Sequence, residues 1–145
     1  MTEIDGMTDK SETGVLPAAD IAITQRVIDA YAAISGDFNP IHVDQAAAAA
    51  TPFGGTIAHG CIPMEPIFRA LHRWLGQPTL PPSTVMSLRY HRPSRPGDII
   101  RVEAHLEEPS AGDIDRVVFV CLNQRSEKVI DGECRVPKAS DVTHG

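Results

Sequence analysis

The sequence is poor in aromatic residues and in cysteine, and it has no long hydrophobic run. Four Phe, two Tyr and one Trp leave the core to be built mainly from Val, Ile, Leu and Ala. The odd number of cysteines, Cys61, Cys121 and Cys134, without CxxC spacing favours a reducing compartment over a disulfide framework. No apolar stretch approaches the roughly 20 residues of a membrane span, and the acidic first residues do not resemble a signal peptide. We therefore expect a cytoplasmic protein with no membrane partner.

The chain also lacks an excess of positive charge. Its 13 Lys and Arg stand against 19 Asp and Glu, which gives a net charge of -6. Without a basic run, a broad electrostatic grip on nucleic acid is not expected, and no glycine-rich phosphate loop is present. A length of 145 residues suits one domain. We place it at residues 19–137, between a flexible tail or short lead-in strand at 1–18 and a flexible tail at 138–145.

Helical periodicity occurs in the first half of the chain. Apolar residues recur at helical spacing over residues 24–35, and Gly36 follows where a left-handed residue ends a helix. Alanine dominates residues 45–50, which predicts a short second helix. A longer apolar pattern predicts a third helix that begins between Gly60 and Pro63, because proline is tolerated only near the first turn.

The second half changes to a period of two. Residues 86–90, 100–106 and 130–136 alternate apolar with polar side chains, as half-buried strands do. Residues 117–122 are apolar on both faces, which predicts the central strand. Helices followed by an antiparallel meander indicate an α+β layer in which the long helix covers one sheet face. The uncovered face and edges favour a homodimer.

Asp37 and His42 lie five residues apart on a predicted loop between the first two helices, which Pro40 braces. A carboxylate beside an imidazole can hold a water molecule and move its protons, which is general acid and base chemistry. The alternative is structural: Asp37 caps a helix and His42 bonds to the backbone. The pattern alone leaves both interpretations open.

The second candidate segment is Ala58-His59-Gly60-Cys61 at the entrance of the long helix. Free N–H groups at a helix N-terminus can stabilise an oxyanion, and Gly60 lets a ligand approach the backbone closely. The alternative is an ordinary glycine at a helix entrance. A nucleophilic Cys61 with His59 or His42 as base is a weaker hypothesis, because free cysteine is usually a small buried hydrophobe.

Two further groups of polar residues are less specific. Possible metal ligands are His42, Asp44, His59 and His91. Their spacing matches no metal motif, so we predict no metal. The residues that can meet phosphates at a pocket mouth, or form a solvated strand face, are Arg89, His91, Arg92 and Arg95.

The two segments together resemble the MaoC-like dehydratases, the family of (R)-specific enoyl-CoA hydratases. The likeness rests on SGDFNPIHVD at 35–44, AHG at 58–60 and the proline-rich strand end at 93–98, and it runs over about residues 21–136. It implies a hotdog fold, in which a long central helix is wrapped by a curved antiparallel sheet. It also implies a homodimer with the active site at the junction of the two copies.

The same resemblance implies reversible syn hydration of a trans-2-enoyl-CoA to a (3R)-3-hydroxyacyl-CoA, without metal or other cofactor. Asp37 and His42 are then the catalytic dyad, and we assign Gly60, Asn39 and His59 to substrate binding. The Gly60 N–H would donate to the thioester carbonyl.

The long helix departs from the family in one respect. Phe68 stands where some hydratases have a small hydroxyl residue, and the helix is unusually polar, which predicts a short acyl pocket or one for a polar acyl group. Two alternatives are an acyl-CoA thioesterase of the same fold and a non-catalytic subunit of a heterodimeric dehydratase. The presence of Asp37 and His42 argues against the second.

Overall fold

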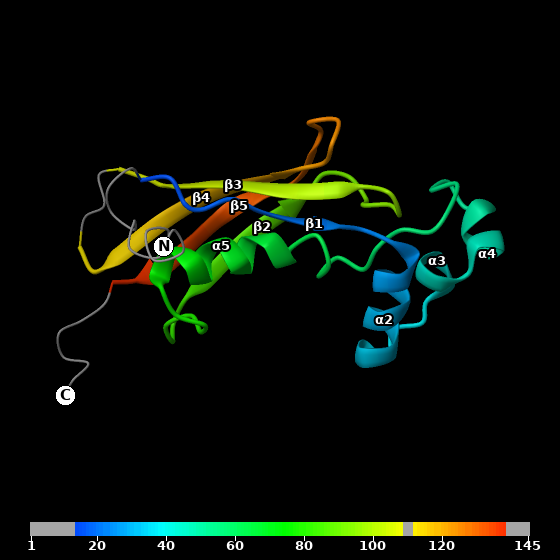
Figure 1. The fold of residues 1–145 in the computed structure, drawn as a ribbon, viewed down its shortest axis with the longest axis horizontal. Coiled ribbons are helices and arrows are strands. Elements are labelled where there is room, and N and C mark those ends of the chain that lie inside the picture. Colours follow the sequence, from blue (N-terminus) through cyan, green and yellow to red (C-terminus); the bar gives the residue numbers. More distant parts are fainter. Residues whose placement is uncertain (1–13, 109–111, 139–145) are drawn as a thin grey trace, which may run out of the picture.

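The computed structural model describes residues 14–108 and 112–138, and it contains a five-stranded antiparallel sheet with four helices (Figure 1). The strands are β1 (Ala19–Ala22), β2 (Val85–Tyr90), β3 (Ile99–Leu106), β4 (Ile114–Leu122) and β5 (Lys128–Pro137). The helices are α2 (Gln25–Ser35), α3 (Pro40–Val43), α4 (Gln45–Ala49) and α5 (Glu65–Leu75). The strand order is β1-β3-β4-β5-β2, which confirms the α+β class and places β4 at the centre.

The core lies between α5 and one face of the sheet. Side chains of α5, among them Ile67, Leu71 and Trp74, are almost fully buried there, because their spacing puts them on one side of the helix. On β4, Phe119 belongs to this inner face, while Val120 on the outer face is half-buried. The apolar character of both faces of β4 is therefore explained by its central place.

Residues before β1 also contact the sheet. Val15 forms an isolated bridge with His105, and the Leu16 N–H donates to Ala104 O over 3.0 Å. The Leu16 side chain is buried in the core. The tail that we expected over residues 1–18 thus has an ordered end at 14–18, whereas 1–13 and most of the expected C-terminal tail, 139–145, lie outside the described residues.

Two helix boundaries differ from the sequence prediction. The prediction that the long helix begins between Gly60 and Pro63 is wrong, because α5 begins at Glu65. The preceding residues form tight turns with three-residue spacing, in which Ile62 N–H donates to His59 O. The second difference is α3, a single helical turn with Pro40 in its first turn, which we had expected to remain a loop.

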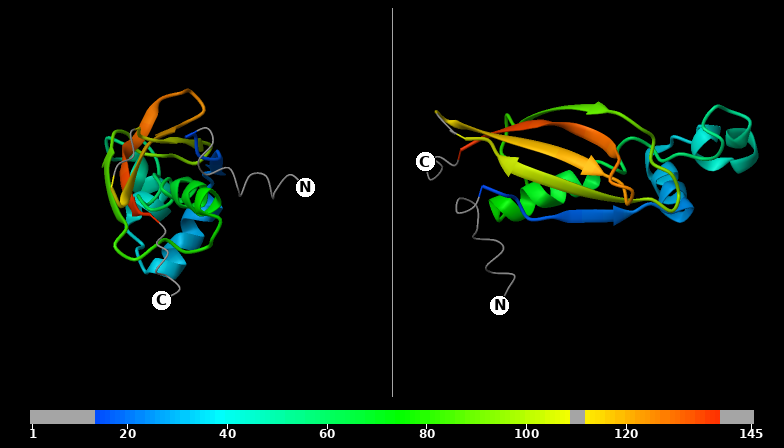
Figure 2. Two further views of the ribbon diagram at one scale, coloured as in Figure 1. Left: turned by 90° about the vertical axis from the view of Figure 1, so that its left-hand side faces the viewer. Right: turned by 90° about the horizontal axis from the view of Figure 1, so that it is seen from above.

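Helices α2, α3 and α4 form an arm beyond the end of α5 (Figure 1). The view from above shows the same arm extending past the ends of the strands (Figure 2). The segment between α4 and α5 returns from the arm to the sheet and carries the AHG sequence, so both candidate segments meet where the arm joins the body.

Neither a membrane span nor a disulfide occurs in the part of the chain that is described. Its helices are too short or too polar to cross a bilayer. All three cysteines are free, with Cys121 and Cys134 buried and Cys61 exposed.

Candidate active site

The structure brings Asp37 and His42 together at the base of the arm. His42 Nε2 lies 3.9 Å from Asp37 Oδ2. The other ring nitrogen, Nδ1, is 2.8 Å from Ile57 O, which can only accept, so Nδ1 carries the proton in the neutral ring. His42 is buried whereas about half of the Asp37 side chain is exposed. The dyad thus has one anchored imidazole and one accessible carboxylate.

The loop that carries the dyad is fixed by short side-chain to backbone bonds. Ser35 Oγ accepts from Asp37 N–H, Asp37 Oδ1 accepts from Asn39 N–H, and Asn39 Oδ1 accepts from Ile41 N–H. Asn39 is therefore the N-cap of α3. The alternative prediction that Asp37 caps a helix is therefore wrong for α3. The predicted bond of His42 to the backbone is present, in addition to its contact with Asp37.

His59 completes a compact cluster with the dyad. Its ring stacks on the His42 ring at 3.9 Å between centroids, with an angle of 26° between the planes. His59 Nε2 is 2.9 Å from the carbonyl oxygen of Asp37. On α2, Tyr31 packs against His59 with ring centroids 4.7 Å apart. The cluster therefore joins residues from α2, the 35–44 segment and the 58–60 segment.

Gly60 presents an N–H group that has no hydrogen-bond acceptor in the described part of the chain. Its carbonyl oxygen accepts a hydrogen bond of 2.7 Å from the Tyr90 hydroxyl. Because α5 begins five residues later, the tight turns after His59, rather than the helix terminus, leave this N–H unpaired. The sequence prediction of an available N–H is unchanged, but its assignment to a helix N-terminus is wrong.

Tyr90 was missed by the sequence analysis. Its position at the end of β2 gives only an alternating strand pattern, and its contact with Gly60 joins residues 30 positions apart. No local sequence signal identifies such a partner. The Tyr90 pKa is raised, first by burial and then by the charges of Cys61 and Cys121.

Cys61 is exposed next to Gly60, and neither of the histidines predicted as its base forms a hydrogen bond with it in the described part of the chain. Among the described residues, the hydrogen bonds of His42 and His59 go to Ile57 O and Asp37 O. Instead the thiol lies near the Tyr31 phenol, whose pKa is raised by a hydrogen bond with Cys61 and by the charges around it. This arrangement does not favour a nucleophilic thiol.

The possible metal ligands divide into separate places. Asp37, His42 and His59 have potential ligand atoms within 4.8 Å of one another. Two of the ring nitrogens, His42 Nδ1 and His59 Nε2, are already bonded to backbone carbonyl oxygens. Asp44 caps α4, and His91 Nε2 pairs with an Asp131 oxygen at 3.0 Å.

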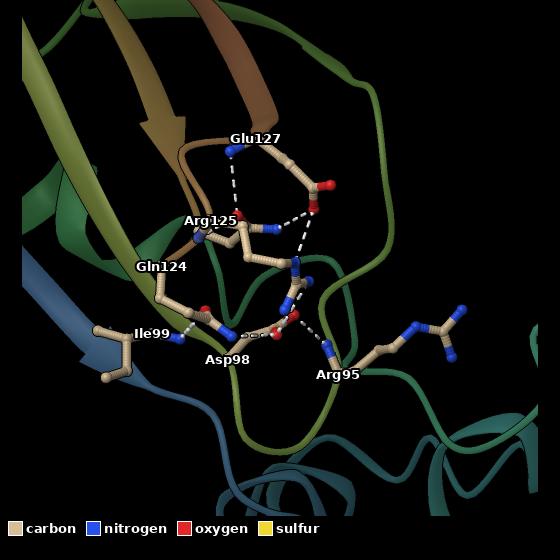
Figure 3. A network of polar contacts seen from close by, with 7 residues as sticks. Arg95, Asp98, Ile99, Gln124, Arg125 and Glu127 are labelled. Atoms are coloured by element: carbon tan, nitrogen blue, oxygen red, sulfur yellow. Dashed lines mark hydrogen bonds and ion pairs between the residues drawn. The ribbon is translucent and has the colours of Figure 1, made fainter.

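The loop at 91–98 runs beside the 53–60 segment and is anchored by Asp98. Asp98 is buried, and its carboxylate accepts from Arg95 N–H at 2.9 Å and from the Gln124 side chain at 3.1 Å (Figure 3). Ala58 N–H donates to Ser94 O at 2.8 Å. The Arg95 guanidinium donates to the backbone carbonyl of Phe53, so one of its N–H groups holds the loop against the 53–60 segment.

Comparisons with known proteins identify a family to which the chain is similar. The family described as MaoC like domain matches residues 8–128, which include both candidate segments. A 3-hydroxybutyryl-CoA dehydratase of Methylorubrum extorquens is 32% identical over 134 residues, covering 90% of this chain and 84% of that protein.

Two solved structures are similar over most of their length. The R-hydratase PhaJ1 of Pseudomonas aeruginosa has a TM-score of 0.70 and 33% identity, over 90% of this chain and 86% of that one. The (R)-hydratase of A. caviae involved in PHA biosynthesis has a TM-score of 0.69 and 25% identity, over 89% of this chain and 99% of that one.

Proposed function

The chain belongs to the MaoC-like domain family, and we propose that it catalyses the reversible hydration of a trans-2-enoyl-CoA to a (3R)-3-hydroxyacyl-CoA. Its fold is the hotdog fold, as in the similar hydratases, with α5 packed on the antiparallel sheet. Hydratase or dehydratase chemistry is common to the names of these relatives. The stereochemistry and the residues below are the finer part of the proposal.

The separation of Asp37 and His42 carries the proposal. A distance of 3.9 Å is too long for a direct hydrogen bond, but one water oxygen can contact both groups. His42 Nε2 has a free lone pair because Nδ1 donates to Ile57 O. Both groups can therefore accept hydrogen bonds from the same water molecule.

The reaction then needs one proton acceptor, one proton donor and a stabilised oxyanion. The oxygen of the held water bonds to C3 of the enoyl group, and one dyad member takes a proton from it. The electron pair of the C2–C3 double bond moves towards the thioester, where the Gly60 N–H stabilises the enolate oxygen. The dyad then delivers that same proton to C2, either directly from the group that took it or through the other group. Both groups thereby return to their starting protonation, and no covalent enzyme intermediate forms.

Because one dyad serves both transfers, water and proton reach the same face of the double bond. We therefore propose syn addition. Reaction in deuterated water, with the configuration at C2 and C3 read by NMR, tests this geometry, and anti addition would require a second catalytic group.

A second copy of the chain is proposed as the partner. Large apolar side chains are exposed on the arm and on the segment that follows α4: Ile34 at 84%, Phe38 at 59% and Phe53 at 37%. Exposed apolar surface of this kind favours association, and a homodimer would cover it beside the active site. Sedimentation of the purified chain tests this, and a stable monomer at micromolar concentration would contradict it.

The decisive experiment follows the hydration of crotonyl-CoA through its enoyl absorbance, with the purified chain alone. We expect hydration to a 3R product without release of free CoA. Release of CoA would indicate a thioesterase. Hydration only after addition of a second, related chain would indicate a subunit of a heterodimeric dehydratase.

A further inference from the structure

His59 contacts both members of the dyad while its own side chain is almost completely buried, with 3% of its surface exposed. We propose that His59 is a positioning residue that holds Asp37, His42 and the Gly60 N–H in one fixed arrangement. This inference rests on the proposed function, since it concerns the same site. In this role His59 orients the reacting groups without reacting itself. Its direct contact with substrate remains a separate prediction.

The first link is the hydrogen bond to Asp37. The carbonyl oxygen of Asp37 can only accept, so the neutral His59 ring must carry its proton on Nε2. This bond of 2.9 Å joins two residues 22 positions apart. It ties the backbone that bears the catalytic carboxylate to the segment that leads into α5.

The second link is the stack on His42. Tyr31 also packs against His59, with ring centroids 4.7 Å apart, so the His59 ring contacts both an aromatic side chain and the catalytic imidazole. His42 is also bonded to Ile57 O, two residues before His59. The short segment 57–59 therefore fixes the plane of the His42 ring and the direction of its Nε2.

The third link passes through the backbone. His59 C=O and Gly60 N–H belong to the same peptide group, which is planar, so fixing one bond direction fixes the other. His59 O accepts from Ile62 N–H at 3.0 Å. The side chain of His59 thus holds the proton-transfer groups, while its carbonyl sets the direction of the proposed oxyanion donor.

A purely structural role does not explain the choice of histidine. His59 Nδ1 is buried and has no hydrogen-bond partner among the described protein atoms. A buried acceptor without a partner destabilises the fold, whereas a phenylalanine ring would stack with no polar atom to satisfy. Histidine is therefore better explained by the bond that its Nε2–H makes with Asp37.

Two variants separate the ring from the donor. His59→Phe keeps a stacking ring and loses the bond to Asp37 O. His59→Gln keeps an amide donor near the place of Nε2 and loses the stack. We expect kcat for crotonyl-CoA to fall roughly 10–100-fold in His59→Phe, because small displacements of catalytic groups are costly, with little change in KM. His59→Gln should recover part of that loss.

The matched control is His105→Gln, which changes an exposed histidine on the outer face of β3 and should leave kcat unchanged. Thermal unfolding should show similar stability for the wild type and His59→Phe. The distinguishing measurement combines His59→Phe with Asp37→Asn. If His59 acts through Asp37, the double variant should be less than about 3-fold slower than Asp37→Asn alone, since residues that act as a unit are not additive.

The outcomes are separable from those of the proposed function. An inactive wild type would overturn the hydratase proposal. The tautomer of the His59 ring is measured without substrate, by NMR of its imidazole nitrogens, so it tests the positioning role separately. We expect the neutral Nε2–H form in the wild type. An Nδ1–H form, full activity of folded His59→Phe, or a fully multiplicative loss in the double variant would each overturn the positioning role.

Discussion

The Tyr90 hydroxyl donates a hydrogen bond to Gly60 O over 2.7 Å, which joins the end of β2 to the peptide beside the proposed oxyanion donor. A Cβ atom on Gly60 would lie 2.9 Å from the Tyr90 oxygen, so the close contact also explains why glycine stands there. The pKa of Tyr90 is raised by burial, so its hydroxyl keeps its proton and remains a donor at neutral pH.

Tyr90→Phe should lower kcat by about 3–10-fold, the effect expected from the loss of one hydrogen bond that orients a peptide. KM for crotonyl-CoA should change little, because the variant removes only a hydroxyl group. Gly60→Ala should be more damaging, since its methyl group collides with the Tyr90 oxygen.

Steady-state kinetics and thermal unfolding of both variants check this relationship. Ser87→Ala, on the exposed side of the same strand, is the control that should keep wild-type activity. Wild-type kcat in Tyr90→Phe would show that Gly60 needs no support from β2.

Local signals in the sequence predicted much of the fold. The bounds of α2 follow from Thr24, whose hydroxyl accepts from Val27 N–H, and from Gly36, which adopts a φ of 81°. Both ends depend on residues within one turn, so the sequence contains all that is needed. The central place of β4 agrees with its apolar residues on both faces, such as Phe119 on the inner face and Val120 on the half-buried outer face.

The start of α5 and the supports of the active site were less accessible. Pro63 and Pro66 restrict the possible first turn but do not decide between tight turns and helix. The 35–44 motif indicated Asp37 and His42, whereas the stack of His59 on His42 depends on how the arm meets the body. Such contacts join distant segments, and no periodicity in either segment records them.

Asp131 makes a small, pH-dependent contribution to stability. Its pKa is lowered from 3.8, first by the hydrogen bond from His91 and then by that from Lys128. A folded-state pKa below the unfolded value stabilises the fold above the unfolded pKa, and this contribution is lost as pH falls through the folded pKa. Because the carboxylate is partly exposed, the effect should be below about 1 kcal/mol.

Asp131→Asn should therefore be slightly less stable than the wild type at pH 6. The difference should shrink as the pH falls below 3.8 and through the lower folded-state pKa, because Asp131 is then protonated in both states. Denaturant unfolding across this pH range measures it. A difference that grows as the pH falls would contradict the sign of the shift.

The three thiols should differ strongly in reactivity. Burial raises the pKa of Cys121 to about 12 and that of Cys134 to about 11, so both remain protonated and covered at pH 8. Exposed Cys61 should then be the one thiol per chain that reacts rapidly with a disulfide reagent, and all three should react after unfolding.

Cys61→Ser should abolish the rapid reaction and keep most hydratase activity, because hydration needs no nucleophilic side chain. An inactive but folded Cys61→Ser would return the thiol to the mechanism.

The dyad gives the strongest prediction for catalysis. Asp37→Asn keeps the size of the side chain but removes its charge and titratable proton, so kcat should fall roughly 10²–10⁴-fold while the fold survives. His42→Ala should cause a comparable loss. If one water molecule contacts both groups across the 3.9 Å between them, the double variant should be far less than multiplicatively slower. Asp113→Asn, which changes an exposed carboxylate just before β4, is the control. Rates for all five proteins, with circular dichroism to confirm folding, separate the possibilities. A near-normal rate in either single variant would remove that residue from the mechanism, and multiplicative losses would mean that Asp37 and His42 act in separate steps.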